Sequence, residues 1–73
     1  MPYTVRLKCT RGSETPETVS AFKVAIAQDF SRRNPRNQIS FNGQTFTYTV
    51  DDIDRDQQLI FATVDDSRLP PGY

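Results

Sequence analysis

The sequence has little of the chemistry that most enzymes and metalloproteins use. Its 73 residues include one cysteine, no histidine and no tryptophan. A single cysteine cannot form an intramolecular disulfide, and without histidine neither a Cys/His zinc-ligand set nor a Ser/His or Cys/His catalytic pair can be assembled. A chain of this length also has little core to wrap around a cofactor. We therefore expect a protein that is not an enzyme and that has no metal site and no cofactor.

Long apolar runs are also missing. Residues 1–8 lack the apolar run of a signal peptide, and no segment approaches the roughly 20 apolar residues that a membrane span needs. We expect a soluble, cytoplasmic protein with no membrane partner. Cys9 falls on the apolar side of an alternating pattern, which predicts a buried thiol that behaves as a small hydrophobic group and is not reactive.

The net charge is zero, but the charges are unevenly distributed. Residues 1–36 contain seven basic and three acidic side chains, a net charge of +4, whereas residues 37–73 contain two basic and six acidic side chains, a net charge of −4. We expect a dipolar surface, which steers association with a complementary partner. A dedicated nucleic-acid binder usually has a clear basic excess, so the neutral total argues against that class.

The segment before residue 36 contains a strand pattern and then a helix pattern. From Tyr3 to Thr10 apolar and polar residues alternate, which predicts a half-buried strand. Thr15-Pro16-Glu17 has the residues of a helix start: a hydroxyl N-cap, proline in the first turn and a carboxylate near the positive end of the dipole. Asn34 precedes Pro35, so the helix should end near residues 31–33, with arginines in its last turn. The stripe expected to pack on a sheet is Val19, Phe22, Ile26 and Phe30.

After Pro35 the period returns to two, around a hairpin signal. Asn42-Gly43 favours a type I′ turn, because both central residues of that turn need positive φ. A two-residue loop there pairs Phe41 with Gln44. It places on one face of the hairpin Ile39, Phe41, Phe46, Tyr48 and Val50. The other face is expected to be exposed and carries Ser40, Thr45, Thr47 and Thr49.

The remaining pattern completes the predicted fold. A polar connection over residues 51–56 leads to a last strand around residues 57–64, which is apolar on both faces and therefore expected to be central or covered. The predicted order is β-α-β-β-β, a two-layer α+β domain with one helix on a mostly antiparallel four-stranded sheet. We assign this single domain to residues 1–66 and expect residues 67–73 to form an extended or disordered tail.

Aspartates at alternate positions suggest a calcium loop. Asp52, Asp54 and Asp56 have the spacing with which carboxylates converge on one cation. The rest of that motif fails, because Gln57 occupies the position that needs glycine and Thr63 the position that needs glutamate. We interpret the segment as a solvated connection between strands. As an acidic surface for a basic partner it is our second choice, comprising Asp51, Asp52, Asp54 and Asp56.

Basic residues are the first choice for a partner-binding surface. Some of them cluster at the expected helix end, where the helix dipole by itself favours cations. Together with those of the first strand and the following loop, they could bind phosphate or an acidic protein surface. The set is Arg6, Lys8, Arg11, Arg32, Arg33 and Arg36. A base-stacking platform is poorly supported, because the hairpin aromatics share the face expected to meet the helix.

Two weaker similarities complete the analysis. Pro70-Pro71-Gly72-Tyr73 matches the proline-proline-any-tyrosine ligand of WW domains, a four-residue signal that we keep as an alternative. In size and outline, a β-α-β-β-β domain with a split charge distribution, one cysteine and extended ends resembles the small phage-encoded proteins that bind and inhibit bacterial host machinery, RNA polymerase in particular. No motif transfers contact residues from that class. The resemblance implies a stoichiometric inhibitor or regulator of transcription that docks through one charged surface.

These observations lead to three hypotheses about function. The first is a small, monomeric protein-binding module that uses the basic set, with bacterial RNA polymerase as its partner. The second is a nucleic-acid-binding domain that uses the same residues, whose affinity would fall steeply with salt. The third is a structural or assembly subunit that self-associates through an exposed strand edge.

Overall fold

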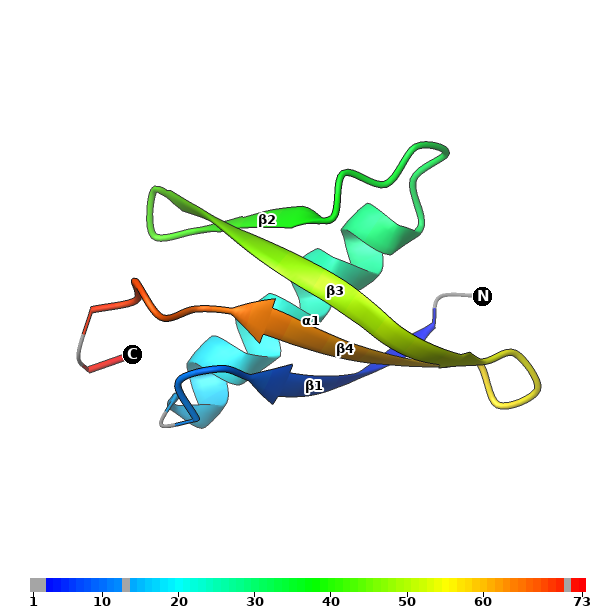
Figure 1. The fold of residues 1–73 in the computed structure, drawn as a ribbon, viewed down its shortest axis with the longest axis horizontal. Helices are drawn as coiled ribbons and strands as arrows, with labels where there is room; N and C mark the ends of the chain where they lie inside the picture. Colours follow the sequence, from blue (N-terminus) through cyan, green and yellow to red (C-terminus); the bar gives the residue numbers. More distant parts are fainter. Residues whose placement is uncertain (1–2, 13, 71) are drawn as a thin grey trace.

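A computed structural model describes residues 3–12, 14–70 and 72–73. The elements follow in the order β1 (Thr4–Cys9), α1 (Pro16–Phe30), β2 (Gln38–Phe41), β3 (Gln44–Asp54) and β4 (Leu59–Asp65). The strands form one sheet in the order β1-β4-β3-β2, and α1 lies across one face of it (Figure 1). The predicted α+β architecture, one helix on a four-stranded sheet, is confirmed.

The central position of β4 explains its composition. β4 pairs in parallel with β1 and antiparallel with β3, and β3 pairs antiparallel with β2. Ile60, Ala62 and Val64 are buried on the helix side of the sheet, while Phe61 lies on the opposite side and is exposed. A strand that is apolar on both faces was expected to be central or covered, and β4 is central.

Helix α1 begins where its sequence predicts and ends just before the predicted residues 31–33. The Thr15 hydroxyl accepts a hydrogen bond from the Thr18 N–H at 3.3 Å, and Pro16 occupies the first turn, where its missing N–H costs nothing. Phe22 and Ile26 are completely buried against the sheet. One detail was wrong: the helix ends at Phe30, so its last turn contains no basic residue and the arginines follow it. In the described part of the chain, no helix has the length and apolarity that crossing a membrane requires.

The β2–β3 hairpin has the predicted turn and register. Asn42 and Gly43 have φ angles of 54° and 75°, as a type I′ turn needs. Phe41 pairs with Gln44 and Ile39 with Phe46. The exposed hydroxyl face is also present, formed by Ser40, Thr45, Thr47 and Thr49.

Strand β3 is longer than predicted. Asp51 and Asp52, which we assigned to a loop, belong to β3, and a register shift between Val50 and Asp52 marks a β-bulge. The bulge inserts one extra residue, so Ile53 returns to the helix side of the sheet opposite Ile60 while Asp52 stays on the other side. The bulge therefore lets an acidic segment continue a strand without burying charge.

The segment after β4 packs on the domain instead of extending away from it. The Leu69 N–H donates to the Asp66 carbonyl at 2.9 Å, which turns the chain, and Leu69 is only 4% exposed. The Tyr73 ring meets Phe41 edge to face with centroids 5.6 Å apart. Although the segment has no helix or strand, Leu69 belongs to the core. The extended or disordered tail expected over residues 67–73 is therefore corrected for Leu69 and Tyr73; Pro71 lies outside the described residues.

We predict that Phe22→Ala destabilises the protein by about 3–5 kcal/mol, because it leaves a cavity between α1 and the sheet. Val24→Ala is the matched control. Val24 is 56% exposed on the same helix, and its replacement should change the free energy of unfolding by less than about 0.5 kcal/mol. Urea unfolding followed by circular dichroism measures both. Equal effects would mean that the helix does not pack as described.

Candidate functional site

The sheet face opposite α1 is covered by no described element and carries part of the predicted basic set (Figure 1). Phe61 is 39% exposed near its centre. Arg6 of β1 and Asp52 of β3 are the cross-strand partners of Phe61. Since residues in register on neighbouring strands point to the same face, these three side chains form a row across the sheet. We call this surface the open face.

A second row of the open face lies beside the first. It consists of Lys8 of β1, Thr63 of β4 and Thr49 of β3. Along the β1 side a shallow groove of about 450 Å³ reaches round to Lys23 of α1. Among the described residues no carboxylate forms an ion pair with Arg6, Lys8 or Lys23; Arg6 and Lys8 are exposed, and Lys23 is half-buried.

Arg32 and Arg36 lie elsewhere, at a groove of about 560 Å³ between α1 and β2. β1 and β2 are the two edge strands, three inter-strand spacings or roughly 14 Å apart. The predicted basic set is therefore divided between the two edges of the sheet. Arg33 is exposed in the loop after α1 and does not line the groove.

The floor of the arginine groove contains Asp29, a residue that the sequence analysis did not single out. Asp29 is 7% exposed and accepts hydrogen bonds from the N–H groups of Arg36 (3.1 Å) and Asn37 (2.9 Å) and from the Tyr48 hydroxyl (2.6 Å). Burial is the largest influence and raises its pKa. These hydrogen bonds, with the Arg32 charge, outweigh burial and lower the pKa below its usual range. Asp29 thus fastens the loop after α1 to the core.

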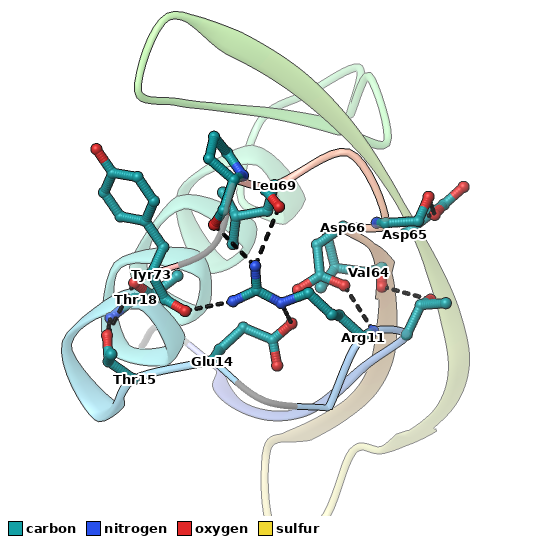
Figure 2. Close-up of polar contacts among 12 residues, drawn as sticks. Arg11, Glu14, Thr15, Thr18, Val64, Asp65, Asp66, Leu69 and Tyr73 are labelled. Carbon is teal, nitrogen blue, oxygen red and sulfur yellow. Dashed lines mark hydrogen bonds and ion pairs between the residues drawn. The ribbon is translucent and has the colours of Figure 1, made fainter.

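Arg11 is used internally, which removes it from the docking set (Figure 2). Its backbone N–H donates to Asp66 Oδ1 at 2.9 Å. Its guanidinium donates to the carbonyls of Leu69 at 3.0 Å, Pro70 at 2.9 Å and Tyr73. Most of its donors are therefore occupied in holding the C-terminal segment. The same contacts engage the backbone that a WW domain would have to bind.

A buried polar cluster surrounds Arg11. Glu14 Oε2 lies 3.5 Å from Arg11 Nε, and the Glu14 side chain is 2% exposed. Burial, followed by its contact with Asp66, raises the pKa of Glu14. Burial, followed by the charges of Glu14 and Asp66, raises the pKa of the Cys9 thiol to about 12. A thiol in this environment stays protonated at neutral pH and is a poor nucleophile.

The acidic residues of the second-choice surface serve the β3–β4 connection. Asp51 Oδ2 accepts a hydrogen bond from the Thr63 hydroxyl at 2.6 Å. Asp54 Oδ1 accepts from the N–H groups of Asp56 (3.1 Å) and Gln57 (3.2 Å), as a turn-capping aspartate does. Within the described ranges these aspartates do not converge as a set of metal ligands.

Comparisons of the chain with protein-family models, with curated proteins and with solved structures found no match. We therefore argue its function from its own surfaces.

We predict that Asp29→Asn lowers the free energy of unfolding by about 1–3 kcal/mol at neutral pH, because an amide cannot accept all three hydrogen bonds. Since folding lowers the pKa of Asp29, the stability contributed by its charge is present above its ordinary pKa of 3.8 and is lost as the pH falls through the folded value. The difference between variant and wild type should shrink below pH 3.8. Urea titrations at several pH values measure it, and a pH-independent difference would contradict the assignment.

Proposed function

We propose that the chain is a non-catalytic protein-binding module that docks through its open face, with Phe61 at the centre of the contact. The observation that carries this proposal is an aromatic side chain 39% exposed on the central strand of an uncovered sheet face. Aromatic and arginine side chains contribute most of the energy at protein interfaces, and Arg6 lies next to Phe61 in register. A rigid sheet also presents both side chains without a large ordering cost.

The charges around Phe61 favour a protein partner over nucleic acid. Arg6 and Lys8 are on the β1 side of Phe61, whereas Asp52 is on the β3 side. A phosphate backbone crossing the open face would meet this carboxylate and be repelled. A protein surface can present an acidic group to β1 and a basic group to β3. The expected partner has an apolar pocket between patches of opposite charge.

Bacterial RNA polymerase is the first partner to test. The support for it is the resemblance in size, outline and charge distribution to small phage-encoded inhibitors of that enzyme. Such a module would act stoichiometrically in the cytoplasm of the bacterium. Self-association through β1 is disfavoured, because the exposed Arg6 and Lys8 on this edge strand repel a second copy.

Binding of single-stranded nucleic acid is a second candidate function. The hairpin aromatics face the helix and argue against this function, but Phe61 is exposed beside two cations on an uncovered sheet face. Base-stacking modules use aromatics in such positions. This function predicts capture that is lost after nuclease treatment and an affinity that falls steeply with salt.

We predict that Phe61→Ala reduces capture of the protein partner from a bacterial lysate by at least about tenfold, as loss of an interface hot spot does. Val24→Ala removes a comparably exposed apolar side chain from the outer side of α1 and should leave capture unchanged. Quantitative mass spectrometry of nuclease-treated samples gives both values. Equal recovery with both variants would exclude the open face as the docking surface.

Charge reversal distinguishes docking through the basic residues of β1 from docking through those that follow α1. Lys8→Glu should abolish capture, because it sets a carboxylate against the acidic group that the partner is expected to present to β1. Arg33→Glu, in the loop after α1, should have little effect. Both residues are exposed, so neither change should reduce stability by more than about 0.5 kcal/mol. The opposite pattern would assign docking to the loop after α1.

A further inference from the structure

Three potential metal ligands from different parts of the chain meet beside the C-terminal segment. Cys9 is the last residue of β1, Glu14 precedes α1, and Asp66 follows β4. One ligand atom from each lies within 4.8 Å of the other two. A point between three such atoms is at most about 2.8 Å from each, against about 2.0–2.3 Å for bonds from zinc to oxygen and sulfur. A closure of several tenths of an ångström would complete the coordination.

A second observation points to a ligand in this cluster. Asp66 is completely buried, yet only its Oδ1 is used, as the acceptor of the Arg11 N–H. Asp66 Oδ2 has no hydrogen-bond partner among the described residues. Glu14 Oε2 also has no hydrogen-bond partner there; it forms an ion pair with Arg11 (Figure 2) and faces the Asp66 carboxylate and the Cys9 thiol. Buried oxygen atoms nearly always have a hydrogen-bond partner or a bound ion. Two buried carboxylate oxygens without a hydrogen bond in one cluster therefore point to a cation that binds them.

The charge balance indicates the valence of that cation. A Cys9 thiolate and the carboxylates of Glu14 and Asp66 together carry three negative charges, and Arg11 offsets one of them. A divalent cation neutralises the remainder. A thiolate ligand selects a borderline metal such as Zn²⁺ over the hard cations Mg²⁺ and Ca²⁺, which prefer oxygen ligands alone.

We propose that Cys9, Glu14 and Asp66 bind a zinc-class divalent cation, with water as the fourth ligand. The thiol proton passes to solvent when the metal–sulfur bond forms. The ion would join the end of β1, the start of α1 and the C-terminal segment, so its role is structural. Cysteine and histidine counts alone had argued against zinc. Glu14 follows β1 in the sequence, but Asp66 reaches the end of β1 only through the parallel pairing of β1 with β4.

Cobalt(II) is the direct probe, because a thiolate-bound cobalt ion absorbs in the near ultraviolet. Titration of the full chain with Co²⁺ should give this band at one equivalent, and Zn²⁺ should displace it. Zn²⁺ should also raise the melting temperature, whereas Mg²⁺ at the same concentration should not. Absence of the band in the folded wild-type protein at millimolar Co²⁺ would overturn the proposal.

Variants locate the ligands. Cys9→Ser and Asp66→Asn should each weaken Zn²⁺ binding by at least about tenfold. A loss of that size is typical even when the mutated residue only hydrogen-bonds to a metal ligand. Asp52→Asn, an exposed acid on the open face, is the control and should bind Zn²⁺ normally. If Asp66→Asn does not fold, Cys9→Ser alone tests the site, because Cys9 is only half-buried and its replacement disturbs the core less. A cobalt band that persists in Cys9→Ser would refute the site. Partner capture is a separate measurement, so neither outcome bears on the proposed docking function.

Discussion

The structure depends on how one helix of 15 residues shields one face of a four-stranded sheet. Phe22 and Ile26 supply the completely buried part of that contact, and each sheet strand contributes side chains to the same layer. The described residues include no second helix for the other face. The open face therefore has no described element over it, and its side chains are exposed to a partner. The packing of the helix on the sheet therefore does not explain the aromatic side chain of Phe61 on the open face.

Local signals made much of the fold predictable. The Thr15 N-cap with Pro16 fixes the start of α1, and Asn42-Gly43 fixes both the turn and the register of the hairpin, because each depends on neighbouring residues alone. The composition of β4 indicated its central position. The β-bulge at Asp51 was not predictable, since an acidic run has the same composition in a loop as in a bulged strand. The packing of Leu69 was missed because a single leucine between polar residues has no periodicity.

The candidate sites were harder to predict, because they depend on contacts between residues distant in sequence. Arg11 was grouped with the docking residues by its charge, but the end of β4 brings Asp66 and the following carbonyls to it. Cys9 and Asp66 meet only because β1 pairs in parallel with β4, a pairing that neither strand's pattern specifies. Phe61 was seen as apolar, but its side of the sheet became clear only with the register.

Some charged residues stabilise the fold through internal hydrogen bonds, and others lie exposed on the surface. Arg11 and Asp29 hold irregular segments against the core and have little exposure, while Arg6 and Lys8 have no ionic partner among the described residues. The most direct test is site-specific photo-crosslinking in a bacterial lysate, with the photoreactive residue at position 61 or at position 24. The docking account predicts a single protein adduct from position 61, the protein recovered by capture, and none from position 24. An adduct from position 24 alone, or a nucleic-acid adduct from position 61, would contradict it.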